Sequence, residues 1–289
     1  MKDRAVVLGG GGPVGIAWET GVAAGLAAEG VKIAEADFIL GTSAGSFVGA
    51  QLAGGRDPHA LADAQIALGR NPPPPPPGAP TSPPDLTPLM GFIARFPPDR
   101  EPGPELRAEI GAFALQAKSV FTEEQFIAVL SQAATSDGAW PARFACTAVD
   151  AQDGAFKVWR KGDGVPIARG VASSCAVPGI YPPIAIRGRR WVDGGMRSPT
   201  NLDLAAGYRR IICLAVVPPL AKTFMAGRLE HEAHKAELEG GRVEVIMPDE
   251  ASGAAFGVNL MDATRRAEIT EAGIAQGKRE AGRLKAFWS

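Results

Sequence analysis

The feature that most constrains this chain is the sequence FILGTSAGS at residues 38–46. A short apolar run ends in Gly-x-Ser-x-Gly, and a helical pattern of small residues follows at once. This layout is typical of a nucleophile elbow, in which a buried strand stops, the backbone turns sharply and a helix leaves in the opposite direction. Ser43 would lie at the tip, while Gly41 and Gly45 would leave room for the neighbouring strand and helix. Because the pattern also arises by chance, the alternative is a glycine-rich strand-to-helix turn whose serine has no catalytic role.

A second glycine-rich turn, Gly9–Gly15, follows an apolar run at residues 5–8 that we expect to be a strand. The backbone N–H groups of Gly10, Gly11 and Gly12 are suited to form an oxyanion hole, because glycines let a substrate approach the main chain. The turn also matches the dinucleotide fingerprint G-x-G-x-x-G. That fingerprint requires an acidic residue at the end of the next strand, where this chain has Gly-Thr-Ser. We therefore favour the oxyanion hole, and dinucleotide binding stays an alternative.

A serine nucleophile needs a base, and the sequence offers two kinds. His231 and His234 lie in a highly charged helical pattern that is typical of a solvated face, and His59 precedes a proline tract. Asp193 follows a predicted strand at residues 189–192 and precedes two glycines, Gly194 and Gly195, so a tight turn would present its carboxylate. A Ser-Asp-His triad, a Ser-Asp dyad and a plain Asp-Gly hairpin turn all remain open from the residues alone.

Four motifs together carry a family resemblance over about residues 4–207. They are GGG at 10–12 with Gly15, GTSAG at 41–45, ASSCAVPG at 172–179 followed by Pro182-Pro183, and DGG at 193–195. In this set and order the chain resembles the patatin-like phospholipase family. One position departs from the family pattern: the family commonly has arginine or lysine just before the last glycine of the first motif, and this chain has Val14.

The resemblance implies a three-layer α/β/α fold with a mainly parallel central sheet. It also implies calcium-independent lipid acyl hydrolysis by a Ser-Asp dyad, with no cofactor and no metal. Carried over by position, Ser43 is the nucleophile and Asp193 is the base, with Gly10, Gly11 and Gly12 as the oxyanion hole. Gly15, Gly41, Gly45, Gly194 and Gly195 would support these groups. Because Val14 stands in place of that cation, the resemblance is weaker support for a phosphate-bearing substrate.

The order of predicted elements favours one domain over residues 1–289, because no linker separates two complete cores. A proline-rich loop at 71–88 interrupts it, and a helical cap inserted around 85–135 follows the loop. Within the cap, the apolar side chains at residues 86–96 suggest a mobile lid over an acyl channel, with an ordinary buried cap helix as the slightly favoured alternative.

Charge and cysteine content exclude several classes of protein. The net charge is −1 and no long basic run occurs, so we expect no nucleic-acid partner. Three scattered cysteines fit neither a disulfide framework nor a zinc site. Without a signal-peptide pattern or a spanning apolar segment, we expect a cytoplasmic protein with transient contact at a membrane surface.

The sequence therefore predicts a serine acyl hydrolase, a phospholipase or an esterase, whose partner is a lipid or acyl-ester substrate. An esterase of another α/β type with a Ser-Asp-His triad is the enzymatic alternative. A non-catalytic protein that binds lipid or a dinucleotide on the same sheet is the alternative from another class. The oligomeric state stays open.

Overall fold

One mixed sheet organises the computed structural model, which describes residues 2–72, 85–119, 121–133, 138–217 and 222–289. The strands are β1 (Lys2–Leu8), β2 (Phe38–Gly41), β3 (Phe144–Asp150), β4 (Phe156–Arg160), β5 (Ile184–Ile186), β6 (Arg189–Asp193), β7 (Tyr208–Leu214) and β8 (Arg242–Ile246). The helices are α1 (Gly12–Ala28), α2 (Ala44–Ala53), α3 (Pro58–Arg70), α4 (Thr87–Ile93), α5 (Pro104–Gln116), α6 (Glu123–Leu130), α7 (Ile167–Ser174), α8 (Lys222–Leu238), α9 (Glu250–Phe256) and α10 (Arg266–Trp288).

The strand order is β5-β6-β3-β2-β1-β7-β8, with β4 paired to β3 outside this path. Neighbours are parallel from β3 through β2, β1 and β7 to β8, and the pairs that β3 makes with β4 and β6 are antiparallel. In the middle of the sheet, Leu8 pairs with both Gly41 and Leu214. The carboxyl ends of β1, β2 and β7 are therefore level, and the two glycine-rich turns leave the sheet at the same edge, where open α/β sheets bind ligands.

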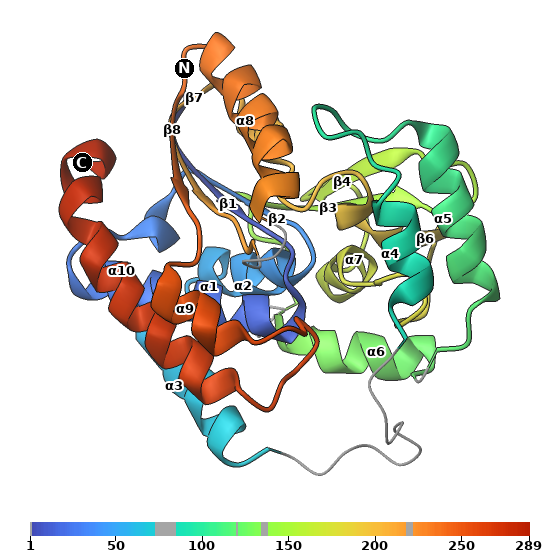
Figure 1. Ribbon diagram of the computed structural model, residues 1–289, viewed down its shortest axis with the longest axis horizontal. Coiled ribbons are helices and arrows are strands. Elements are labelled where there is room, and N and C mark those ends of the chain that lie inside the picture. The colour runs from blue at the N-terminus through green and yellow to red at the C-terminus, as the bar shows by residue number, and fades with distance from the viewer. Residues whose placement is uncertain (1, 73–84, 120, 134–137, 218–221) are drawn as a thin grey trace.

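Alternate residues of the central strands face opposite helical layers. Val6 and Leu8 belong to the core that α1, α2, α7 and α10 complete, whereas Ala5 and Val7 face α8. Helices α4 and α5 pack on Val149 and Val192, so they cover the β3–β6 part of the sheet. Figure 1 shows α8 on one side of the sheet and α1, α2 and α10 on the other. The predicted three-layer α/β/α fold with a mainly parallel sheet is confirmed.

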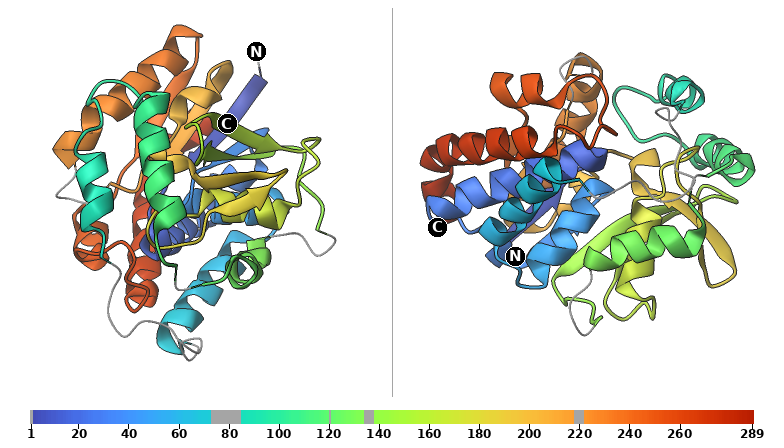
Figure 2. Two further views of the ribbon diagram at one scale, coloured as in Figure 1. Left: turned by 90° about the vertical axis from the view of Figure 1, so that its right-hand side faces the viewer. Right: turned by 90° about the horizontal axis from the view of Figure 1, so that it is seen from below.

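Helices α1 and α10 approach each other closely because glycines face each other along the contact. A Cβ added at Gly25 would lie 2.2 Å from the Ile274 carbonyl oxygen, and one added at Gly277 would lie 2.4 Å from the Val22 oxygen. Figure 2, seen from below, shows the two helices side by side. Helices α1 and α10, which are far apart in the sequence, therefore pack with their backbones in close contact.

Several boundaries differ from the sequence-based expectation. Helix α1 begins at Gly12 rather than at Ile16, because the later glycines of the turn already form its first helical turn. Strand β5 and helix α9 were not predicted, since each is short and lacks a strong periodic pattern. The capping box of Thr122 and Gln125 and the β3–β4 hairpin are confirmed. Much of the proline-rich loop, residues 73–84, lies outside the described part of the chain.

The cap consists of α4, α5 and α6, which lie between α3 and β3 in the chain. In the segment proposed as a lid, Leu89 and Phe96 are buried in the core under α5, whereas Met90 is exposed. This arrangement fits a packed cap helix better than a free flap. Across the described ranges, no helix is both long and apolar enough to cross a bilayer.

Candidate active site

Ser43 occupies the turn between β2 and α2 with a backbone that non-glycine residues rarely adopt, at φ 52° and ψ −118°. Such conformations cost about 1–3 kcal/mol and persist only where the surroundings enforce them. Here the end of α7 does so: the Ser43 N–H donates to Ser174 Oγ at 3.0 Å, and Cys175 Sγ donates to the Ser43 carbonyl at 3.1 Å. Ser46 Oγ donates to the same carbonyl at 2.7 Å. The strained turn is therefore held from both sides.

The two flanking glycines of this elbow have no space for a side chain. A Cβ at Gly41 would lie 2.4 Å from the Gly45 carbonyl oxygen. A Cβ at Gly45 would lie 2.1 Å from the carbonyl oxygen of Leu8 on the neighbouring strand. Backbone atoms cannot move aside as a flexible side chain can, so the sharp strand-to-helix turn requires glycine at both positions.

Asp193 reaches Ser43 because two strands meet end to end. Strand β4 occupies one edge of β3 along residues 145–149, so β2 and β6 must share the other edge. There Gly41 pairs with Cys146 and, only two residues further along β3, Asp193 pairs with Ala148. Since β2 and β6 run in opposite directions, their carboxyl ends point toward each other. The Ser43 turn and the Asp193 turn therefore face each other across a short gap.

The Asp193 carboxylate lies in a dry environment with one oxygen uncommitted. Its side chain is 2% exposed, and Oδ1 accepts the Gly195 N–H at 2.7 Å. No hydrogen-bond partner of Oδ2 is found among the described residues. Burial raises the pKa of Asp193 to about 7, and the Gly195 N–H and the Ser43 hydroxyl oppose that rise in part. The two side chains are thus close neighbours, but Ser43 Oγ falls outside the geometry of a formed hydrogen bond to Oδ2.

In the glycine loop between β1 and α1, one of the three predicted donors is already bonded to another loop. The Gly10 N–H donates to the Pro199 carbonyl at 2.7 Å, so Gly10 is not available as an oxyanion donor in this structure. A Cβ there would instead lie 3.3 Å from Ser43 Cβ, so Gly10 provides clearance beside the serine. Within the described chain, no acceptor is bonded to the N–H groups of Gly11 and Gly12 or to that of Ala44, the first residue of α2.

A family model described as "Patatin-like phospholipase" matches residues 6–206. The chain belongs to this family. The matched range contains the glycine loop, the Ser43 elbow, α7 and the Asp193 turn, and it ends before β7. The sequence-based recognition of the patatin-like family is confirmed.

Other comparisons give distant matches or none. VipD from Legionella pneumophila has a TM-score of 0.45 and 13% identity, and the match covers 98% of this patatin-like chain and 67% of the VipD chain. The type III effector protein ExoU has a TM-score of 0.42 and 15% identity, with 99% of this chain and 53% of that chain covered. The chain therefore spans about half the length of the ExoU chain. No curated protein matches the chain.

A loop beyond the family-matched range contacts the glycine loop of this patatin-like protein. The Val14 N–H donates to the Leu260 carbonyl at 3.3 Å, and a Cβ at Gly12 would lie 2.9 Å from Met261 Sδ. The Val14 side chain, at the position where the family commonly has a cation, is fully buried in the core. An apolar packing residue thus stands where the family commonly has a cation. No motif in the sequence indicated that the loop around Leu260 would contact the glycine loop.

None of the three histidine side chains forms a hydrogen bond within the parts of the chain that the structure describes, and His59 and His234 are exposed. The charged helix that contains His231 and His234 is α8, yet it is not wholly solvated. Glu232 and Arg228 on the same helix are buried, and Glu232 accepts hydrogen bonds from the Thr200 hydroxyl and the Leu202 N–H. The helix is therefore a structural part of the layer next to β7.

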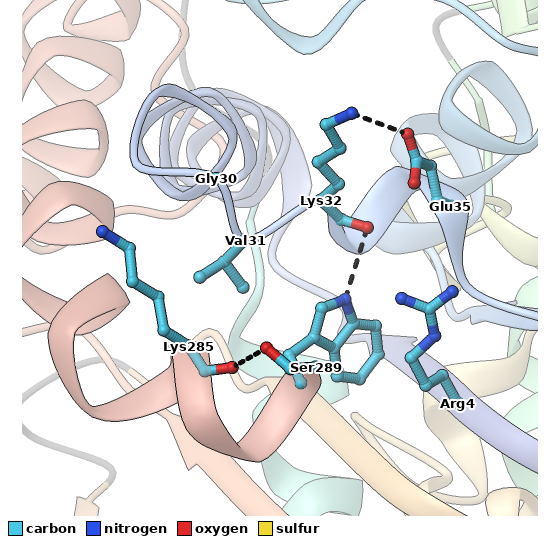
Figure 3. A pocket seen from close by; sticks show the side chains of 8 residues that line it. Arg4, Gly30, Val31, Lys32, Glu35, Lys285 and Ser289 are labelled. Atoms are coloured by element: carbon cyan, nitrogen blue, oxygen red, sulfur yellow. Dashed lines mark hydrogen bonds and ion pairs between the residues drawn. The ribbon is translucent and has the colours of Figure 1, made fainter.

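The candidate site is closed to solvent in this structure. Ser43 is 7% exposed. A hollow of about 120 Å³ lies elsewhere, at the amino-terminal edge of β1 and β2, where Arg4, Lys32 and Lys285 line it (Figure 3). None of the predicted site residues borders that hollow. Among the described residues, no group of three or more metal-ligating side chains occurs.

Proposed function

We propose that this protein is a serine acyl hydrolase that cleaves lipid or other acyl esters with Ser43 as nucleophile and Asp193 as base. The observation that carries the proposal is the buried Asp193 carboxylate, whose free oxygen lies beside a serine on a strained elbow. A carboxylate whose pKa lies near neutrality can accept a proton from the serine and return it to the leaving group. Membership of the patatin-like phospholipase family supports a lipid as the substrate.

The proposed reaction has two halves. In the first, Asp193 removes the Ser43 proton as Oγ attacks the ester carbonyl, and the alcohol leaves with that proton. In the second, Asp193 activates a water molecule that hydrolyses the acyl-enzyme. The N–H groups of Gly11, Gly12 and Ala44 are the donors that we assign to the oxyanion, with the α2 N-terminus adding its favourable dipole.

Covalent labelling tests the nucleophile. We expect an organophosphonate at low excess to modify Ser43 alone, as mapped by peptide mass spectrometry, and to abolish ester hydrolysis. Ser43→Ala should take up no label and should hydrolyse no ester. Ser131→Ala serves as the control, because Ser131 is exposed and its hydroxyl donates to the Ala128 carbonyl, outside the proposed site. Labelling of Ser174 with Ser43 unmodified would contradict the assignment.

A second set of variants distinguishes the dyad from a triad. Asp193→Asn keeps the shape of the side chain but removes the base, so turnover should fall by about 100-fold or more. Replacing both His231 and His234 should leave most activity. An inactive double histidine variant that is still folded by circular dichroism would support a Ser-Asp-His triad instead.

A further inference from the structure

The side-chain amide of Asn201 lies between the two turns that carry Ser43 and Asp193. Asn201 is fully buried and adopts the left-handed conformation, at φ 53° and ψ 35°. Its Nδ2 donates to Thr42 Oγ1 at 3.0 Å and to the Ser198 carbonyl at 2.7 Å, with a longer 3.4 Å contact to the Gly194 carbonyl. Thr42 is the residue before Ser43, and Gly194 is the residue after Asp193. One amide therefore contacts both turns.

The middle of β3 completes this connection. Thr42 Oγ1 is 2.9 Å from Thr147 Oγ1, and Thr147 lies between the β3 residues that pair with Gly41 and with Asp193. A Cβ added at Gly194 would lie 2.1 Å from the same Thr147 oxygen. The Thr147 side chain therefore lies between the ends of β2 and β6. Both its hydroxyl and the Asn201 amide form a hydrogen bond with Thr42 Oγ1.

Neighbouring charges fix the orientation of the amide. Arg197 Nη1 donates to Asn201 Oδ1 at 2.7 Å, so the oxygen faces the guanidinium and the nitrogen faces Thr42. Arg197 is held in turn by Asp203, through hydrogen bonds of 3.0 and 2.6 Å. On either side of Asn201, the buried Glu232 carboxylate binds the Thr200 hydroxyl and the Leu202 N–H. The loop thus presents one rigidly oriented donor to the two turns.

We propose that Asn201 is a positioning residue that sets the separation between the Ser43 hydroxyl and the Asp193 carboxylate, an inference that rests on the proposed function. Oδ2 of Asp193 has no hydrogen-bond partner among the described residues, so no hydrogen bond of that oxygen fixes its distance from Ser43. The separation of the two groups therefore depends on the backbone turns, and Asn201 connects those turns directly. A displacement of about 1 Å between reacting groups can lower a rate by about 100-fold.

Two variants separate this role from a general effect on folding. Asn201→Gly accepts the left-handed backbone but removes the amide. We expect its kcat to fall by about 10- to 100-fold with little change in KM, while urea unfolding stays cooperative. Asn71→Gly, at an exposed position, is the matched control and should keep the parent kcat. A folded Asn201→Gly protein with the parent kcat would overturn the proposal.

Asn201→Asp keeps the shape of the side chain but puts a carboxylate oxygen where Nδ2 donates to Thr42 Oγ1 and to the Ser198 carbonyl. An ionised carboxylate cannot donate these hydrogen bonds, so we expect kcat to fall by about 10- to 100-fold with little change in KM. A residue that merely stabilised the fold would leave the kcat of the folded protein unchanged. A folded Asn201→Asp protein with the parent kcat would overturn the proposal even if Asn201→Gly failed to fold.

The proposed function is checked in the same experiment by organophosphonate labelling of the parent protein. If the parent is not labelled at Ser43, the proposed function fails. If the parent is labelled and active but both Asn201 variants behave like it, only the positioning role fails.

Discussion

At the scale of single residues, two buried carboxyl groups of the described chain have an oxygen without a hydrogen-bond partner. Asp193 has one hydrogen-bonded oxygen, and Glu19 on α1 has no hydrogen-bond partner for either oxygen within the described chain. Burial is the main cause of the raised pKa in both cases. The positions differ in one respect: Asp193 faces Ser43, the proposed nucleophile, whereas Glu19 is enclosed beneath the glycine loop near Gly9. We expect the first to control activity and the second to control stability.

The Asp193 pKa of about 7 predicts how activity depends on pH. Below that value the carboxyl group is protonated and cannot accept the serine proton, so kcat/KM should fall about tenfold for each pH unit below the limb. The profile of a p-nitrophenyl ester from about pH 5 to about pH 9 should therefore show half-maximal kcat/KM near the Asp193 pKa. An acid limb near the ordinary carboxylate value would contradict the raised pKa of Asp193.

The raised pKa of Glu19 predicts that stability changes with pH in the direction opposite to activity. Its pKa in the folded protein is raised well above 4.5, the ordinary value that applies in the unfolded chain. Unfolding therefore releases a proton above that ordinary value, and stability falls as pH rises from there toward the folded pKa. Glu19→Gln cannot ionise, so relative to the parent it should gain stability between about pH 4 and about pH 7 in urea unfolding.

Glu124→Gln, at an exposed position on α6, is the control and should show no such gain. If the effect of Glu19→Gln on the free energy of unfolding is the same at neutral pH as in acid, folding does not raise the pKa of Glu19, and the interpretation is wrong.

At the scale of elements, the elbow depends on how closely α2 approaches β1. Gly45 lies against the Leu8 carbonyl, whereas Gly49, one turn further along α2, faces side chains at 3.1 Å or more. Gly45→Ala should therefore lower the free energy of unfolding by about 3 kcal/mol or more, because backbone atoms must separate. Gly49→Ala should change it by less than about 1 kcal/mol. Equal effects of the two substitutions in urea unfolding would contradict this account of the elbow.

Elements with a local signature could be predicted from the sequence. The Ser43 elbow, the Asp57 cap of α3 and the Thr122 capping box all depend on residues a few positions apart. The site itself depends on pairings between distant segments, such as the shared edge of β3 that brings Asp193 to Ser43. No periodicity reveals that pairing: the residues offered Asp193 as one of several candidate bases, and the family motifs favoured it.

The same reason explains what was missed in the glycine loop. The bond from Gly10 to Pro199 and the contact of Asn201 with Thr42 join residues more than 150 positions apart. A run of glycines indicates which N–H groups lie near a substrate, but not which of them another loop has already engaged. The structure shows that the Gly10 N–H is engaged by Pro199, and our proposal therefore assigns the oxyanion to the N–H groups of Gly11, Gly12 and Ala44.

At the scale of the whole molecule, the part of the chain beyond residue 206 completes the family-matched core. Strand β7 pairs with β1 along Lys2–Leu8, and α10 packs on α1, which begins at the glycine loop. Gly277→Ala should lower Tm by several degrees, because its Cβ would meet the Val22 carbonyl of α1. Gly282→Ala lies on the same helix with open space around it and should leave Tm unchanged or slightly raised. Equal Tm values for the two variants would show that the helices separate without cost.

The central place of β1 in the sheet has a consequence for biosynthesis. A ribosome makes β1 before the other strands of this sheet, and β2 follows soon after, but the partner for the other edge of β1 is β7, about 200 residues later. At about 5–20 residues per second, that edge stays open for some tens of seconds in the nascent chain. An unpaired apolar strand is a template for wrong association, so we expect chaperones that bind nascent chains to raise the yield of soluble protein.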